Sequence, residues 1–525
     1  MNELEAWKRA EQLLSQRRIN AAREQYATLR DSAELAIAAR MRLSMIAGGT
    51  GNFRAAVDEV VDAVACVREV ADPHALSMLL KRLMAVGEHE LGLAVSRQRS
   101  LQQCHDVEPL AEVGKLLSDH GYAAEALQLL ERAHAKGLTS APLYFLLGTC
   151  RMRLGDRDRA EQNLQRGIAR DSGFAPNHWQ LSKLRRQTSD DHHIDRLRQT
   201  LLRAKQPMDR ALLGYALFKE LDDLGDYAAA WDAWATAAAT MKSAIGYRPG
   251  RDPAVLDQLL AVDAAAGQPQ VQLSPDDGPA PIFIVGLPRS GTTLLERMLG
   301  QHSKVKAGGE LGDLVMQLRY VANKGGLASI DAELVAALPN IDHQAWGQRY
   351  VGHVAWRADG HAFLTDKLPT NFRLVGEILR ALPNARILHV AREPVAACFS
   401  NLRECFFGGT YGYSNDMQDM ADYFRGYEQM MSQWDARYPG RVHRVRYEDM
   451  VSATRETLAA TLTHCGLDWE EACLDTTAAG DVVATASAAQ VREPIHSRSV
   501  AHWRHYETQL TPLIERIGGV VGATG

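Results

Sequence analysis

A chain of 525 residues is too long for one ordinary hydrophobic core, and its 46% hydrophobic content is enough for two or three domains. The formal net charge of −5 is small and no long basic run occurs, which excludes a general affinity for nucleic acid or an anionic membrane. No apolar run approaches the length that spans a bilayer, and the start, MNELEAWKRAEQLL, is charged and helical in pattern, so we expect a cytoplasmic protein. Seven scattered cysteines without a CxxC pair favour reduced thiols over a disulfide framework or a zinc site, and no metal site is expected.

The first half of the chain carries a repeat. A glycine is followed five residues later by an alanine in GNFRAA, GYAAEA, GDRDRA and GDYAAA, and a weaker copy reads GEHELG. These glycines are residues 51, 87, 121, 155 and 225, so successive copies lie 36, 34, 34 and 70 residues apart, the last being two periods. A spacing near this value is typical of helix-turn-helix repeats, with the glycine at the turn and the alanine where paired helices come close. In the clearest copy, Gly148 and Ala160 place small side chains on both helices of a pair.

This pattern resembles tetratricopeptide repeats over residues 1–245, which implies an all-α solenoid. Such an array offers a concave surface for a peptide or a partner protein. It serves equally well as a packing surface for a second domain or as a dimer interface. Nothing in the sequence marks the concave face, so these alternatives stay open.

A change of composition follows the repeats. Between residues 246 and 279 the chain is rich in Gly, Pro and Asp around one short helical stretch, AVLDQLLAVDAAA. We therefore expect a linker at 246–279 and a second domain at 280–525.

The second domain is expected to begin with an anion site. In PIFIVGLPRSGTTLLERML, residues 281–285 read as a buried strand, 286–290 as a turn, and 291 onward as a helix. A glycine turn running into a helix N-terminus presents backbone N–H groups and the positive end of the helix dipole to an anion. The candidate anion-binding residues are Arg289, Ser290, Gly291, Thr292 and Thr293.

The glycine spacing of this turn is that of the GxxxxGK[ST] loop, but Thr292 stands at the lysine position. Without that lysine, and with no evident acidic strand end for magnesium, transfer of a γ-phosphate is poorly supported. The segment PRSGTTLLERML instead resembles the 5′-phosphosulfate-binding loop of sulfotransferases, most closely the tyrosylprotein sulfotransferase-like branch. This resemblance extends over residues 281–520 and implies a P-loop-type α/β domain with a parallel sheet and 3′-phosphoadenylyl sulfate as the donor.

Two further motifs match catalytic elements of that family. Glu310 in HSKVKAGGEL matches the family's general base, and its alternative role is to cap the helix expected to follow. Lys367 in FLTDKLPTNF matches a lysine that would stabilise charge on the leaving oxygen, and its alternative is a surface ion pair with Asp366. His302 competes as the base, because many cytosolic sulfotransferases use a histidine, but its position just past the loop helix favours a structural role.

The remaining matches concern the donor. Arg392, at the end of the predicted strand RILHVA, and Ser400, at the start of the next helix, match the residues that bind the 3′-phosphate in the family. Arg392 has a surface ion pair with Glu393 as its alternative. Tyr447 in RVRYEDMV matches an aromatic residue near the nucleotide, with core packing of a strand tyrosine as its alternative.

The C-terminal segment 485–506 resembles the family's loop over the nucleotide and adds Ser487 to the catalytic candidates. The sequence thus predicts sulfuryl transfer from 3′-phosphoadenylyl sulfate to an acceptor hydroxyl. The alternatives are a nucleotide-dependent phosphotransferase and a repeat scaffold with an inactive nucleotide-binding domain. The acceptor stays open, because Glu404 replaces a further arginine of the tyrosylprotein enzymes and GELGDL lacks the arginines that follow their glutamate.

Overall fold

The computed structural model describes residues 2–68, 71–267, 278–406, 410–476 and 500–521. Internal contacts divide the chain into two compact units. Unit 1 comprises Met1–Leu138 and Gly312–Trp356, and unit 2 comprises Thr139–Leu311 and Arg357–Gly525. This division does not follow the expected boundaries at 245 and 279, which stay a prediction. No helix in the described ranges combines the length and the apolar character needed to cross a membrane.

Helical pairs build the first half of the chain, as predicted. Each repeat glycine lies in the turn between two helices and has a positive φ of 81° to 90°, a conformation that glycine adopts without strain. The helices are α1 (Glu3–Ser15), α2 (Ile19–Ala27), α3 (Ala36–Gly49), α4 (Phe53–Ala65), α5 (Pro73–Ala85), α6 (His89–Ser96), α7 (Arg99–Gln102), α8 (Val107–Asp119), α9 (Ala123–Ala135), α10 (Ala141–Leu154), α11 (Arg157–Arg170), α12 (Ala175–Lys183), α13 (Ile194–Arg203), α14 (Pro207–Leu224) and α15 (Tyr227–Ile245).

Small residues let the paired helices approach closely. The alanines five residues after the glycines, at 56, 126, 160 and 230, are all 0% exposed. A Cβ atom at Gly148 of α10 would lie 2.8 Å from Cγ of Leu164 and 3.3 Å from the backbone oxygen of Ala160 on α11. The expectation of small side chains at the helix contact is therefore confirmed. Unit 1 is completed by α18 (Asp313–Ala322), α19 (Ala332–Ala337) and α20 (His343–Val354).

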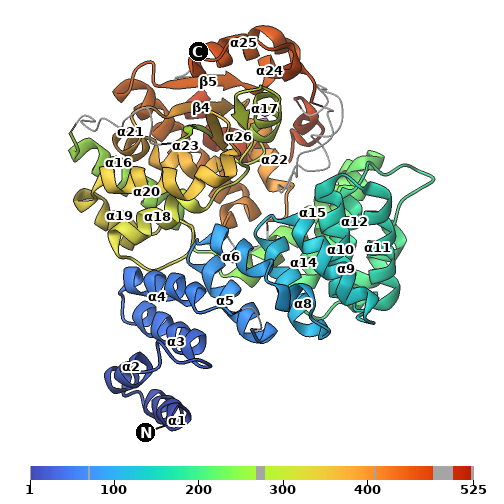
Figure 1. Cartoon of the computed structure of the whole chain (residues 1–525). Helices are drawn as coiled ribbons and strands as arrows, with labels where there is room; N and C mark the ends of the chain where they lie inside the picture. Colours follow the sequence, from blue (N-terminus) through green and yellow to red (C-terminus); the bar gives the residue numbers. More distant parts are fainter. Residues whose placement is uncertain (1, 69–70, 268–277, 407–409, 477–499, 522–525) are drawn as a thin grey trace. The chain divides into compact units, whose positions relative to one another are not determined.

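A five-stranded parallel sheet organises the second half, with the order β2-β3-β1-β4-β5. Its neighbouring strands β4 and β5 are labelled in Figure 1. Its strands are β1 (Ala280–Gly286), β2 (Val305–Lys306), β3 (Phe363–Asp366), β4 (Arg386–Ala391) and β5 (Val442–Arg446). The helices that follow or flank them are α16 (Arg251–Ala265), α17 (Thr292–Leu299), α21 (Val375–Ala381), α22 (Pro394–Leu402), α23 (Met417–Arg437), α24 (Tyr447–Ser452), α25 (Thr454–Cys465) and α26 (Thr511–Val521). The predicted fold class, a helical N-terminal region followed by an α/β domain with a parallel sheet, is confirmed.

Alternate residues of the central strands pack on opposite faces of the sheet. Ile282 and Ile284 of β1 join α17, α24 and α25 in one buried cluster. On the other face, His389 of β4 contacts Tyr427 of α23, and burial lowers the pKa of this histidine to about 3. The sheet therefore has a helical layer on each side, and its carboxyl-terminal edge carries the loops.

The expected linker contains the helix α16, and this helix is packed into unit 2. Leu256 is 0% exposed and Asp263 is 1% exposed. Asp263 accepts a hydrogen bond from Tyr438 at 2.8 Å and pairs with Arg437 at 2.9 Å and with Arg380. This part of the segment is thus an integral element of the unit.

The close approach of α10 and α11 leads to a prediction about the stability of a variant at Gly148. Gly148→Ala adds a methyl group where backbone and side chain already occupy the space, so we expect a loss of about 1–3 kcal/mol despite the better helix propensity of alanine. Gly49→Ala is the matched control, because Gly49 ends α3 and a Cβ there meets nothing within 4 Å. Thermal unfolding followed by circular dichroism measures both. Equal midpoints for the two variants would contradict the packing described here.

Candidate active site

The loop after β1 has the predicted strand, turn and helix. Its backbone has left-handed φ values of 65° at Arg289 and 107° at Gly291, which is the N-cap residue of α17. A Cβ at Gly286 would lie 2.6 Å from the backbone oxygen of Val390, so only glycine lets β4 approach this closely. The hydroxyl of Ser290 donates to the oxygen of Leu287 at 2.7 Å. The loop is therefore held in one conformation from within and by the neighbouring strand.

Arg392 and Tyr447 pack against this loop, which itself carries Arg289. Arg392 donates from Nη1 to the backbone oxygen of Arg289 at 3.0 Å, and its guanidinium lies 4.7 Å from the ring centre of Tyr447. A Cβ at Gly291 would lie 2.5 Å from Cδ2 of Tyr447, so the ring packs directly on the loop. Burial lowers the pKa of both guanidinium groups, and the charge of Arg289 lowers the pKa of Arg392 further. An anion bound here would stabilise this concentrated positive charge.

The structure corrects two local details of the donor motifs. Tyr447 is the first residue of α24 rather than a strand residue, since β5 ends at Arg446. Tyr447 fits both interpretations made from the sequence. It packs in the core cluster, where it is 9% exposed, and its ring also lines the loop. Ser400 lies in the last turn of α22 rather than at its start, because the helix already begins at Pro394. Glu393 caps that helix by accepting from the backbone N–H groups of residues 395 and 396.

Glu310 and Lys367 form an ion pair. Nζ of Lys367 donates to Oε1 of Glu310 at 2.7 Å, with the lysine side chain 0% exposed and the glutamate side chain 37% exposed. The helix α18 has Gly312 as its N-cap residue and no side-chain cap, which disfavours the capping role for Glu310. The alternative of a surface ion pair between Lys367 and Asp366 is not observed. Lys367 is buried, and Asp366 accepts a hydrogen bond from Asn371 at 3.2 Å. A buried ammonium group and an accessible carboxylate thus stand together.

Glu296 and Thr365 hold this pair in place, and sequence reasoning missed both. Oε1 of Glu296, on α17, accepts from the hydroxyl of Thr365 at 2.8 Å and from the N–H of Gly309 at 2.9 Å. The same hydroxyl accepts from the N–H of Gly308 at 3.0 Å, and Lys367 N–H donates to Gly309 O at 2.9 Å. Burial raises the pKa of Glu296, an effect that the charge of Lys367 opposes. No sequence motif marks these residues, because the contacts join segments distant in the chain.

Two further candidates, His302 and Ser487, remain from the sequence. The side chain of His302 is 0% exposed, and its Nε2 lies 3.1 Å from the backbone oxygen of Asp468, which supports the structural role. Ser487 lies outside the described residues. Its role therefore stays a prediction.

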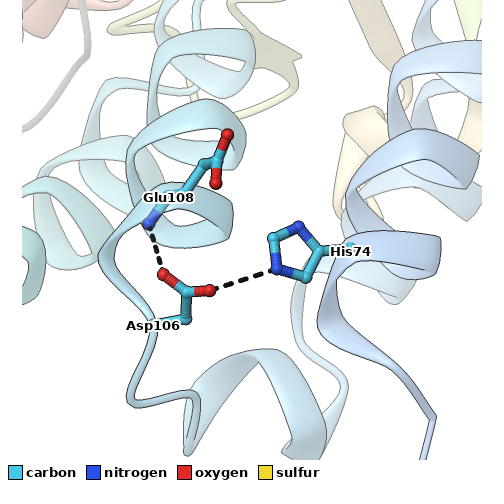
Figure 2. A group of neighbouring side chains, drawn as sticks. All are labelled: His74, Asp106 and Glu108. Carbon is cyan, nitrogen blue, oxygen red and sulfur yellow. Dashed lines mark hydrogen bonds and ion pairs between the residues drawn. The ribbon is translucent and has the colours of Figure 1, made fainter.

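The described residues include one group with metal-ligand geometry, which lies in unit 1 (Figure 2). Asp106, the N-cap residue of α8, accepts from the N–H of Glu108 at 3.1 Å and lies 3.1 Å from Nε2 of His74 on α5. All three side chains are exposed. These contacts account for the group as a helix cap that joins neighbouring repeats, and we assign it no ligand.

The candidate residues of unit 2 follow one edge of the sheet. Lys367 follows β3, the loop follows β1, Arg392 follows β4 and Tyr447 follows β5. Since these four strands are neighbours and parallel, their carboxyl-terminal ends meet at the same edge. Ligands of open parallel sheets bind at this edge. The arrangement can hold an anion at the loop and place a carboxylate and an ammonium group to one side of it.

The hydroxyl of Thr365 gives a testable prediction. Thr365→Val preserves the shape but leaves the N–H of Gly308 without its acceptor, so we expect a loss of about 1–3 kcal/mol in the free energy of unfolding. The control is Thr463→Val, which removes an exposed hydroxyl bonded within α25 and should change stability by less than about 0.5 kcal/mol. Urea unfolding measures both, and an unchanged midpoint for Thr365→Val would contradict the role assigned to this hydroxyl.

Part of this chain is similar in sequence to known proteins. The model of the sulfotransferase family matches residues 281–471. A protein of Aquifex aeolicus named as uncharacterised is 31% identical over 318 residues, which cover 58% of this chain and 41% of that protein. The protein-tyrosine sulfotransferase of Drosophila melanogaster is 26% identical over 195 residues, covering 37% of this chain and 39% of that enzyme.

The chain thus spans less than half the length of these two relatives. Among solved structures, the sulfotransferase domain from the curacin biosynthetic pathway is 21% identical, with a TM-score of 0.32, and covers 46% of this chain and 98% of that domain. The family match falls on β1 and the loop and continues through Glu310, Lys367, Arg392 and Tyr447. The chain therefore contains a domain of the sulfotransferase family.

Proposed function

We propose that this protein transfers a sulfuryl group from 3′-phosphoadenylyl sulfate to an acceptor hydroxyl. The observation that carries the proposal is the ion pair of Glu310 and Lys367 at the sheet edge that also carries the loop, where Arg392 packs on Arg289 and both arginines are largely shielded from solvent. The family match of residues 281–471 supports the same activity. An ATP-dependent phosphotransferase is less well supported, because Thr292 stands where a triphosphate loop has its lysine.

The order of the strands suggests how the donor would lie. The loop after β1 would bind the 5′-phosphosulfate through backbone N–H groups, Arg289, Ser290 and Thr293. Towards β4 and β5, Arg392, Ser400 and Tyr447 would receive the 3′-phosphate and the nucleoside. Towards β3, Lys367 and Glu310 would face the sulfuryl group. One edge of the sheet thus has a place for both ends of the donor.

The chemistry would be a direct in-line displacement. The acceptor oxygen forms a bond to sulfur while the bond between sulfur and the bridging oxygen of the 5′-phosphate breaks, and adenosine 3′,5′-bisphosphate leaves. Glu310 takes the proton of the acceptor hydroxyl, which its 37% exposed side chain can reach from the solvent side. The ammonium group of Lys367 stabilises the negative charge that builds on the leaving oxygen.

The class of acceptor is not part of the proposal. The Drosophila relative is named for protein tyrosine. In this chain Glu404 is 7% exposed and lies near Arg289, where the tyrosylprotein-like pattern has a further arginine. We therefore infer an acceptor hydroxyl without assigning it to tyrosine. Binding of a peptide or protein by the repeats stays a prediction.

Stabilisation of the folded chain by a ligand distinguishes a sulfotransferase from an ATP-dependent phosphotransferase. A ligand that binds only the folded chain raises its unfolding temperature, so adenosine 3′,5′-bisphosphate should raise the midpoint of the full chain more than ATP with magnesium. The midpoint is measured by thermal shift at equal ligand concentrations. A larger shift with ATP and magnesium would favour the phosphotransferase and overturn the proposal.

The base is tested by substitution at Glu310. Glu310→Gln removes the proton acceptor, so we expect kcat to fall by about 10²–10⁴-fold with nearly unchanged affinity for adenosine 3′,5′-bisphosphate. The matched control is Glu515→Gln, which changes an exposed glutamate on α26 and should leave both quantities unchanged. Turnover is followed as release of adenosine 3′,5′-bisphosphate in the presence of a pool of hydroxyl acceptors. Turnover retained by Glu310→Gln would remove this residue as the base.

A further inference from the structure

A carboxylate lies between the anion-binding loop and a repeat helix. Glu404 follows α22, and its side chain is 8% exposed. One oxygen, Oε1, binds Nζ of Lys183, the last residue of α12. The other oxygen, Oε2, lies 4.0 Å from Nε of Arg289 in the loop. All three residues belong to unit 2.

Glu404 and Lys183 have opposite effects on the binding of an anion at Arg289. A buried carboxylate next to Arg289 competes with an incoming anion for the guanidinium group and repels the anion. Lys183 offsets that effect, because its ammonium group binds the same carboxylate and neutralises its charge. The lysine is itself confined, with a 17% exposed side chain and Nζ 4.9 Å from the ring centre of Trp179.

The segment that carries Glu404 is anchored to two more repeat helices. The backbone oxygen of Leu402 accepts from Nε1 of Trp234, on α15, at 2.7 Å. Arg403 donates to Oδ2 of Asp222, on α14, at 2.7 Å. The last residue of α22 and the two residues that follow it are thus each bonded to a different repeat helix, which fixes the carboxylate beside the loop.

We propose that Lys183 is a positioning residue of the donor site: by binding Glu404, it keeps that carboxylate from competing with the donor for Arg289. The inference rests on the proposed function in taking the donor as the anion at the loop. It gives the repeat region a defined part in donor binding, in addition to any partner that its surface binds. The acceptor and the chemical step are unaffected by it.

The test compares the affinity of the full chain for adenosine 3′,5′-bisphosphate among four variants by isothermal titration. Lys183→Met should weaken binding about tenfold, because residues within one charge network couple by amounts of this size. Lys183→Arg, which keeps the charge, should stay within about threefold of the parent. Glu404→Gln alone should bind at least as tightly as the parent, and the double variant Lys183→Met with Glu404→Gln should regain the parent affinity.

The matched control is Lys219→Met. Lys219 is a largely buried lysine of α14 that pairs with Asp223 rather than with Glu404, so its loss should not weaken nucleotide binding. Circular dichroism verifies that each variant is folded. If Lys183→Met fails to fold, the role of Lys183 can still be overturned, because weaker binding than the parent by Glu404→Gln or by the double variant would contradict it.

The outcomes separate this inference from the proposed function. A parent chain that binds adenosine 3′,5′-bisphosphate supports the donor assignment, whatever the variants do. Parent-like binding by Lys183→Met, a double variant as weak as Lys183→Met, or weakened binding by Glu404→Gln would each overturn the role of Lys183. A parent chain that binds neither this nucleotide nor ATP with magnesium would overturn both.

In assays of turnover, Lys183→Met should raise the KM for the donor and leave kcat within about threefold of the parent. A purely structural role would lower the amount of active protein and reduce kcat instead. A fall in kcat with an unchanged KM would therefore contradict the positioning role.

Discussion

The parallel pairing of β1 with β3 and β4 is the constraint on which the candidate site depends. It brings the ends of these strands to one edge, so that Lys367, the loop and Arg392 become neighbours although they are far apart in the chain. This pairing also requires a glycine at position 286, because a side chain there would collide with the backbone of β4. The positive charge gathered at this edge is what makes it suitable for an anionic donor.

Much of this arrangement could be predicted from the sequence because it depends on local patterns. The glycine period predicted the helical pairs, and the run of apolar residues before GLPRSGTT predicted a strand, turn and helix. Glu310 and Lys367 were found through short motifs, and the structure adds the 2.7 Å hydrogen bond between them. The resemblance to a family identified the candidate residues in the sequence, whereas the contacts between them are known only from the structure.

The features that could not be predicted are contacts between distant segments. Glu296 and Thr365 look like ordinary helix and strand residues, yet together they fix the backbone before Glu310. Asp222 of the repeat helix α14 belongs to none of the motifs found in the sequence, yet it accepts from Arg403, His502 and Tyr506. Burial raises its pKa, and these donors outweigh burial and hold the pKa well below its usual range. The helices α12, α14 and α15 thus belong to the repeats by sequence and to the α/β unit by contact.

The proposed function requires a sulfuryl group to leave 3′-phosphoadenylyl sulfate at the site of Glu310 and Lys367. The most direct measurement supplies the full chain with a donor labelled in its sulfate sulfur, together with a cell extract as the acceptor pool. The proposed function predicts that the label moves to an acceptor with the parent chain and does not move with Glu310→Gln. Equal transfer by both proteins, or transfer of the terminal phosphate of ATP in place of sulfate, would contradict it.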